Sequence, residues 1–168
     1  RHTGVQRGIR VLENDLDVWI IQIALAESVA ARLRKHGFKC KTVEITVRDN
    51  GLYSFSRQIH LRQPTNITNE IVTAAFQLFK DNYKWEHPIR SLGIRAADLV
   101  LDDIPVQLDL FGNQEKKEKL EKLDRTVDEI RRRFGYFSIQ RAAMYQDKVL
   151  PHLDAGTHTI HPHSYFHG

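Results

Sequence analysis

Arginines and small hydroxyl-bearing residues recur together between residues 42 and 95, and this combination suits the binding of phosphate groups. Polar and apolar residues alternate from Cys40 to Arg48 and again from Tyr53 to Arg62, which predicts two strands with a shared polar face. Guanidinium and hydroxyl groups contact phosphates without reading bases. The residues predicted on this face are Thr42, Glu44, Thr46, Arg48, Ser54, Ser56, His60, Arg62 and Arg95.

The positive charge of the chain is concentrated in its first part. Residues 1–98 contain 15 Lys and Arg against 10 Asp and Glu, whereas residues 99–168 contain 10 against 11. A basic excess confined to one segment indicates a polyanionic partner such as nucleic acid. Cys40 is the single cysteine, which fits a reducing, intracellular compartment. No apolar run is long enough to span a bilayer, so we expect no membrane partner.

Residue types that perform catalysis do not converge in this sequence. Asp102 and Asp103 are adjacent in an expected linker, which is typical of a solvated pair rather than an acid–base dyad. His161 and His163 lie in a His-rich tail without Cys or carboxylate ligands at suitable spacing. Cys40 begins a strand and has no activating partner, so partial burial is expected. We therefore predict no catalytic residue, no metal site and no cofactor in this chain.

The polar face requires a particular order of elements. A strand is predicted at residues 4–11, and a helix then begins at a cap formed by Asn14 or Asp15 and ends near Gly37. The "DNG" turn joins the two alternating strands, "PTNITNE" caps a second helix, and "HPIRSLGIRAADL" predicts a last strand. Strand, helix, strand, strand, helix and strand predict an α+β fold: a four-stranded antiparallel sheet with both helices on one face. Arg57 departs from the alternation and falls on the apolar side.

The sequence changes character after residue 98. Residues 1–98 are predicted to form one domain, residues 99–113 a linker, and residues 114–168 a C-terminal helix and His-rich tail. Glu and Lys or Arg at a spacing of four support the helix from Gln114 to Arg133. One narrow apolar stripe on it comprises Leu120, Leu123, Val127 and Ile130. Because the stripe is barely two heptads long, packing on its own domain or on other domains is favoured over a dimer seam.

The linker contains the apolar pentapeptide "QLDLF", formed by Gln107, Leu108, Asp109, Leu110 and Phe111. One interpretation is that Leu110 and Phe111 fold back on the domain. The charged residues that flank the segment favour another, in which the three apolar side chains are buried by a second protein.

Three runs of the sequence resemble the little-finger domain of Y-family translesion DNA polymerases: "ALAESVAARLRKHGFKCKTVEITVRDNG", "SFSRQIHLRQPTN" and "PIRSLGIRAADL". They are similar to the DNA polymerase IV-like, ImpB/MucB/SamB branch of Gram-positive bacteria. The run "QLDLFGNQEKKEKLEKLDRTVDEIRRRFGYFSIQRA" resembles the C-terminal segment of such polymerases, so the resemblance covers nearly the whole chain. It implies a module whose sheet docks along the major groove of primer–template DNA. The family's contacts correspond to Ser56 and Arg57, to Gly93–Arg95 and to the "GVQRG" run with Arg7, and the basic cluster adds Arg48 and Arg62.

The resemblance also implies where the chemistry lies. In the family, the acidic residues of a separate palm domain bind two magnesium ions, and no such motif occurs in this sequence. The fragment is therefore expected to bind DNA without catalysis, while its parent is a Mg²⁺-dependent DNA polymerase for translesion synthesis in the cytoplasm, associated with the nucleoid. "QLDLF" resembles the pentapeptide that binds the bacterial sliding clamp, which implies the clamp as a second partner.

Two alternatives from other classes stay open at this point. The same order of elements builds the RNA-binding RRM fold, which requires aromatic residues on its open sheet face. Here Tyr53 and Phe55 share a face with Ile59 and Leu61, which indicates the core. The other alternative is a protein-interaction domain that uses the apolar stripe of the C-terminal helix.

Overall fold

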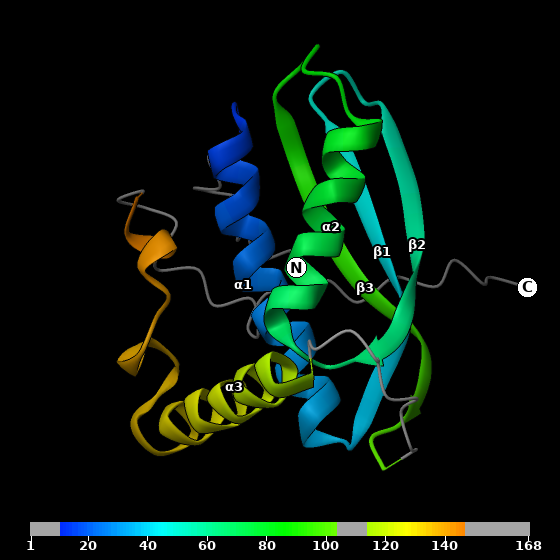
Figure 1. Cartoon of the computed structure of the whole chain (residues 1–168). Coiled ribbons are helices and arrows are strands. Elements are labelled where there is room, and N and C mark those ends of the chain that lie inside the picture. Colours follow the sequence, from blue (N-terminus) through cyan, green and yellow to red (C-terminus); the bar gives the residue numbers. More distant parts are fainter. Residues whose placement is uncertain (1–10, 104–113, 147–168) are drawn as a thin grey trace, which may run out of the picture.

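The computed structural model describes residues 11–103 and 114–146. In chain order its elements are α1 (Asp15–Lys35), β1 (Phe38–Asp49), β2 (Ser54–Thr65), α2 (Thr68–Asn82), β3 (Ile89–Leu101), α3 (Gln114–Phe134) and the short 3-10 helices η1 (Tyr136–Ser138) and η2 (Ala142–Gln146). Figure 1 shows α1 and α2 side by side on one face of the sheet, with α3 running across the lower end of this helix layer. The predicted α+β class, with both helices on one face, is confirmed.

The described sheet has three antiparallel strands in the order β2-β1-β3, rather than the four that were predicted. The predicted first strand at residues 4–11 lies outside the described residues except for Val11. Leu12 forms an isolated antiparallel bridge with Ile89, and the backbone N–H of each residue donates to the carbonyl of the other at 2.9 Å. The chain that leads into α1 therefore pairs with β3.

The order of the strands distinguishes this fold from an RRM. In the split-βαβ arrangement of an RRM, the first and third strands of the module are neighbours and the second strand lies at an edge. Here the second predicted strand is β1, which is central because it is hydrogen-bonded to both β2 and β3. The RRM alternative is therefore wrong.

The core lies between the sheet and the two covering helices. Alternation along β1 directs Val43, Ile45 and Val47 to the helix side, where each is at most 1% exposed. They belong to one buried cluster with Ile20 of α1 and Phe79 of α2. Burial of such a side chain contributes about 1.5–3 kcal/mol, so this cluster fixes which face of the sheet is left open.

The helix ends follow the sequence signals at α1 but not at α2. The Oδ1 atom of Asn14 accepts a hydrogen bond from the backbone N–H of Asp17 at 2.9 Å, so Asn14 is the cap of α1. Gly37, just past α1, has a φ of +71° and ends the helix as predicted. At α2 the cap position is Ile67, which makes no side-chain cap bond. The expected local cap is wrong, because the first N–H of α2 donates to α3 instead.

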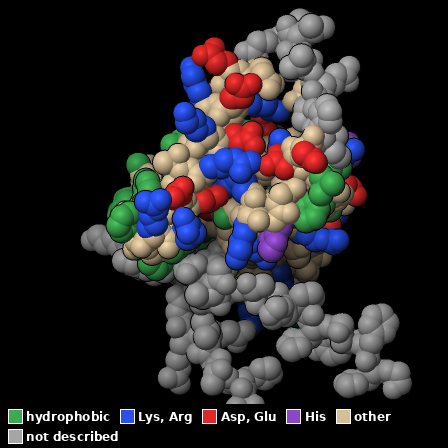
Figure 2. All heavy atoms as spheres, turned by 90° about the horizontal axis from the view of Figure 1, so that it is seen from below, with side chains coloured by type: hydrophobic (Ala, Val, Ile, Leu, Met, Phe, Trp, Pro, Cys, Tyr) green, Lys and Arg blue, Asp and Glu red, His purple; other side chains and the backbone are tan. Residues whose placement is uncertain are grey.

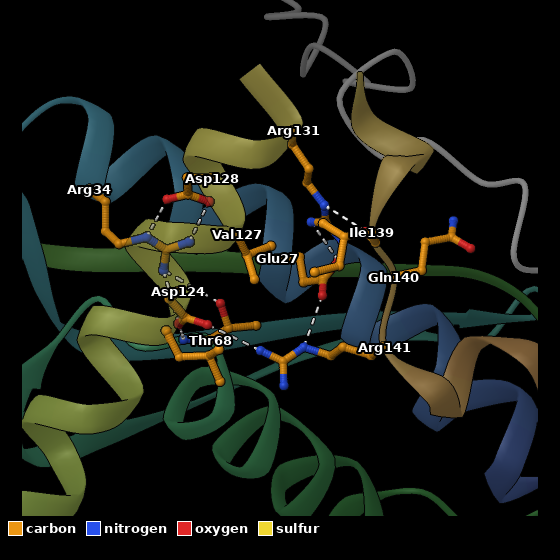
Figure 3. A pocket seen from close by; sticks show the side chains of 11 residues that line it. Glu27, Arg34, Thr68, Asp124, Val127, Asp128, Arg131, Ile139, Gln140 and Arg141 are labelled. Carbon is orange, nitrogen blue, oxygen red and sulfur yellow. Dashed lines mark hydrogen bonds and ion pairs between the residues drawn. The ribbon is translucent and has the colours of Figure 1, made fainter. Parts of the chain in front are cut away.

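α3 contacts the helix layer through charged residues, as the close-up in Figure 3 shows. Asp124 is the one buried residue of α3, whereas Leu123 of the predicted apolar stripe is 53% exposed. One carboxylate oxygen of Asp124 accepts from the backbone N–H of Thr68 at 2.7 Å and lies 3.2 Å from the guanidinium of Arg34. The inward face of α3 is therefore centred on Asp124 and not on the leucine, and the helix packs on its own chain.

Candidate nucleic-acid interface

The face of the sheet opposite the helices consists of aligned rows of polar and small residues. Residues that pair directly across antiparallel strands point to the same face, so the strand register defines each row. The rows, written from β2 through β1 to β3, are Ser54–Arg48–Ser91, Ser56–Thr46–Gly93, Gln58–Glu44–Arg95 and His60–Thr42–Ala97. The structure thus brings together the residues that alternation predicts for the polar face, apart from Arg62.

Phe, Tyr and Trp are absent from these four rows, in which the imidazole of His60 is the one ring. Phe55 pairs with Val47, so its ring lies on the helix side, where it stacks on Tyr83 with ring centroids 6.2 Å apart. A face without Phe, Tyr or Trp offers little stacking surface for unpaired bases, while hydroxyl groups and short side chains allow a phosphate backbone to approach closely.

Arg48 and Arg95 supply the positive charge of the open face. Arg48 is exposed in the row at the hairpin end of the sheet. The Arg95 side chain is 70% exposed, and its Nη1 lies 3.7 Å from an oxygen of Glu44 in the same row. An exposed pair at this distance is weak, so Arg95 remains free to exchange Glu44 for a phosphate.

Arg57 does not belong to the open face. It pairs with Ile45, which places it on the helix side of β2, opposite to Ser56. Its guanidinium carbon lies 5.6 Å from the centre of the Phe55 ring, and its Nη1 donates to the carbonyl of Ser56 at 2.9 Å. The side chain is nevertheless exposed along the β2 edge.

The remaining predicted contact residues lie at the margins of the face. Arg62 is exposed, but it follows the last regular pair between Thr42 and His60, where the register of β1 and β2 shifts. Pro64 lies in this irregular stretch and has no N–H to donate to a ladder. Arg7 lies outside the described residues.

Sequence reasoning missed a hydrogen-bonded chain at one end of the open face. The Thr42 hydroxyl donates to the carboxylate of Asp98 and lies 3.1 Å from Nδ1 of His60. Asp98 reaches this position because its backbone has a φ of +51°, a conformation that Asp adopts more readily than most residues. Alternation alone places His60 on the polar face, but no local signal brings Asp98 to it.

The pentapeptide Gln107–Phe111 lies outside the described residues, whereas the segments on either side of it are described. β3 continues to Leu101, past residue 99 where the linker was predicted to begin. Asp102 lies 2.8 Å from Nζ of Lys39 and 2.7 Å from Nη2 of Arg125 on α3. Burial alone would raise the pKa of Asp102, but hydrogen bonds and attraction from Lys39 and Arg125 outweigh it, so the pKa lies below its usual value.

A cavity of about 120 Å³ lies between α1, α3 and the segment that follows α3 (Figure 3). Its charged lining residues are Glu27, Arg34, Asp124, Asp128, Arg131 and Arg141. Three arginines thus meet three carboxylates, and each of these groups is already in an ion pair within the set. Viewed from below (Figure 2), basic and acidic side chains are likewise interspersed on the surface. Such a balanced cluster fixes α3 and does not favour a charged ligand.

The described ranges contain neither a cluster of metal ligands nor a membrane-spanning helix. Within residues 11–103 and 114–146, no group of three or more His, Cys, Asp or Glu is arranged to hold a metal ion. No helix of the described part is long and apolar enough to cross a membrane. The tail histidines, including His161 and His163, lie outside these ranges. Cys40 is buried, which raises the pKa of its thiol to about 11.

Several curated DNA polymerases are similar in sequence to this chain. DNA polymerase IV of Acetivibrio thermocellus is 43% identical over 141 residues, which cover 84% of this chain and 35% of that protein. DNA polymerase IV 2 of Bacillus subtilis is 34% identical over 132 residues, which cover 77% of this chain and 31% of that protein. DNA polymerase IV of Pelotomaculum thermopropionicum is 32% identical over 126 residues, which cover 75% of this chain and 30% of that protein. The chain spans about a third of the length of these curated relatives.

A model of the impB/mucB/samB family C-terminal domain matches residues 9–110. The matched range includes all three described strands, both helices of the helix layer and the four rows of the open face. It therefore covers more than half of the chain and the whole of the candidate interface. On this evidence the chain belongs to the impB/mucB/samB C-terminal domain family of Y-family polymerases.

Proposed function

We propose that this chain is the non-catalytic, DNA-binding little-finger part of a translesion DNA polymerase, and that its open sheet face holds the backbones of primer–template DNA. The single observation that carries the proposal is the composition of the four rows, in which hydroxyl groups and two arginines occur without Phe, Tyr or Trp. Groups of this kind position a duplex through its phosphates. The names of the relatives, which are DNA polymerases, support the same assignment.

The open face favours a duplex over single-stranded nucleic acid. Binding of single strands without base reading depends largely on stacking of bases on aromatic side chains. The aromatic residues Phe55 and Tyr83 are instead stacked on each other on the helix side. Phosphate contacts along two strands, as in a duplex, therefore account for the residues on the open face better than stacking does.

Catalysis and Mg²⁺ binding are proposed to belong to the part of the parent polymerase outside this chain. The relatives are about three times as long as the matched segment, which leaves room for a separate catalytic region. The parent is proposed to act in the cytoplasm, on the nucleoid, during DNA repair. Nucleotide incorporation by this chain alone, measured on a primed template with Mg²⁺, would overturn the assignment.

Salt-dependent DNA binding tests the central proposal. Contacts with about five phosphates should give a slope near −4 to −5 when the logarithm of the association constant is plotted against that of the salt concentration. Fluorescence anisotropy of a labelled primer–template duplex measures this slope. Arg48→Ala and Arg95→Ala should each weaken binding and make the slope shallower by about one. Lys119→Ala is the matched control, because Lys119 is exposed on α3 and paired with Glu115 at 2.8 Å.

Alanine variants of Arg57 and Arg62 test how far the interface extends beyond the open face. Arg57→Ala reports on the helix-side edge of β2, and Arg62→Ala on the irregular stretch that follows the last row. A loss of affinity in both variants extends the proposed interface around the β2 edge. A loss of affinity in Arg48→Ala and Arg95→Ala only would confine the proposed interface to the open face. Binding that is insensitive to salt and unaffected by all four changes would contradict a phosphate interface.

We further propose that Gln107–Phe111 docks this chain on the bacterial sliding clamp. Burial of each apolar anchor contributes about 1.5–3 kcal/mol, and ordering of a free linker costs about 2–5 kcal/mol. The balance corresponds to a contact of roughly micromolar strength, which suits a polymerase that is exchanged on the clamp. Calorimetry with a bacterial clamp should show binding that the double change Leu110→Ala and Phe111→Ala abolishes. Leu123→Ala, at an exposed leucine of α3, should leave it unchanged.

A further inference from the structure

The hydrogen-bonded chain from Asp98 through Thr42 to His60 lies at the end of the open face. Thr42 is 3% exposed, whereas His60 and Asp98 are exposed. Thr42 and His60 are direct partners across β1 and β2, and Thr42 also pairs with Ala97 of β3, next to Asp98. Thr42 and His60 are thus held by paired strands at the edge of the proposed DNA contact, and the left-handed backbone of Asp98 lies beside them in β3.

The positions of the protons in this chain follow from its chemistry. A hydroxyl group has one proton to donate, and an ionised carboxylate can only accept. Because the Thr42 hydroxyl donates to Asp98, its oxygen must accept from Nδ1 of His60, 3.1 Å away. The neutral imidazole therefore carries its proton on Nδ1, and Nε2 has an unprotonated lone pair.

We propose that His60 is a phosphate-binding residue of the open face, oriented by Thr42 and Asp98 so that its Nε2 contacts a DNA phosphate when the imidazole is protonated. The inference rests on the proposed function of the sheet as a DNA interface. With Nδ1–H engaged by Thr42, a neutral His60 presents only an acceptor at Nε2 and cannot bond a phosphate oxygen. Protonation at Nε2 creates a charge-assisted donor, so the contact forms with the uptake of one proton.

The charges around His60 come from every strand of the sheet. On β3, Asp98 accepts from the Thr42 hydroxyl that holds the ring. On β1, Glu44 lies one row along and is paired with Arg95 of β3. On β2, Arg62 follows two residues later. The helix layer covers the other face of the sheet (Figure 1). DNA phosphates add further negative charge, so DNA binding and protonation of His60 favour each other.

Three variants separate the parts of the proposal. His60→Gln keeps a polar side chain but cannot become charged. Thr42→Val preserves the shape of a buried residue and removes both hydrogen bonds of the chain. Asp98→Asn removes the charge while Asn tolerates the φ of +51° at this position. His36→Gln is the matched control, because His36 is an exposed histidine at the C-terminal cap of α1.

The experiment measures the dissociation constant for a labelled primer–template duplex between about pH 6 and pH 8, the range in which histidine titrates. The affinity of the unaltered chain should fall by up to about tenfold as the pH rises. The profile should be flat in His60→Gln, unchanged in His36→Gln, and smaller in amplitude in Asp98→Asn and Thr42→Val, because the ring is then less well oriented. A His60→Gln profile identical to that of the unaltered chain would overturn the inference while leaving the DNA interface intact.

A second readout tests the orientation of the ring without DNA. The ¹⁵N chemical shifts of the His60 imidazole at neutral pH should report a proton on Nδ1 in the unaltered chain and a mixture of tautomers in Thr42→Val. A proton on Nε2 in the unaltered chain would overturn the proposed orientation. Failure of the chain to bind DNA at any pH would instead contradict the proposed function itself, and the inference with it.

Discussion

The carboxylate of Asp124 on α3 lies 3.2 Å from the guanidinium of Arg34 on α1, and both side chains are at most 6% exposed. The same carboxylate oxygen accepts the N–H of Thr68, the first residue of α2, at 2.7 Å. A negative charge at the start of a helix is favoured by the helix dipole and by the free N–H groups there. One side chain of the C-terminal helix thus joins both helices of the helix layer.

Removal of Asp124 should therefore destabilise the whole domain. Asp124→Ala leaves Asp128 as the remaining carboxylate partner of Arg34 and removes the acceptor of the Thr68 N–H, so the free energy of unfolding should fall by about 3–5 kcal/mol. Urea unfolding followed by circular dichroism measures this change in the free energy of unfolding. Glu118→Ala, at an exposed position on α3, should change stability by less than about 0.5 kcal/mol. Equal effects of the two changes would contradict the role assigned to Asp124.

The contrast between the sheet and α3 explains how much of this structure could be predicted from the sequence. Alternation along β1 and β2 predicts the open face because the period of a strand depends only on neighbouring residues. The apolar stripe on α3 predicts Leu123 as an inward residue by the same kind of local rule. Asp124 is buried instead, because its partners Arg34 and Thr68 are 90 and 56 residues away in the sequence. No local pattern encodes such a contact.

The same limit applies within the candidate site. The register of β1 and β2 brings His60 opposite Thr42, as alternation predicts. The third member of the hydrogen-bonded chain, Asp98, depends on a left-handed backbone conformation in β3 that Asp tolerates but does not require. Arg57 shows the opposite case, since its departure from the alternation correctly indicated the helix side of β2.

Acid should weaken the contact between the end of β3 and α3. The pKa of Asp102 is lowered by Lys39 and Arg125 against the effect of burial, so the folded state binds the Asp102 proton more weakly than the unfolded state. The stability from this group is present above the ordinary Asp pKa of about 4 and is lost as the pH falls through the lower folded value. When urea unfolding is repeated from neutral to acidic pH, the free energy of unfolding should therefore fall less steeply with acid in Asp102→Asn than in the unaltered chain. The same dependence on acidic pH in both proteins would exclude a contribution of Asp102 to stability.

Cys40 should resist thiol reagents in the folded protein. Burial disfavours the thiolate and raises the pKa of Cys40 to about 11, well above the value near 8.5 of a free cysteine. The reactive thiolate is therefore scarce at neutral pH, and the buried side chain is also inaccessible. Labelling with a chromogenic disulfide should be slow in buffer and complete rapidly in denaturant. Rapid labelling of the folded chain would show that β1 opens locally at Cys40.

Leu52, at the tip of the hairpin between β1 and β2, is strained and exposed. Its φ is +67° and it is 65% exposed, so the left-handed conformation costs energy that burial does not offset. Asn adopts this conformation more readily, and Leu52→Asn should raise the free energy of unfolding by roughly 0.5–1 kcal/mol. The same change at Leu123, which is 53% exposed in the regular helix α3, should lower it by about 0.5 kcal/mol, because Asn is a poorer helix former. Urea unfolding of both variants gives the two changes in the free energy of unfolding. Because both leucines are exposed, changes of opposite sign would separate the effect of backbone conformation from the loss of an apolar side chain. A loss of stability at both positions would mean that the Leu52 side chain contributes more through its contacts than its backbone conformation costs.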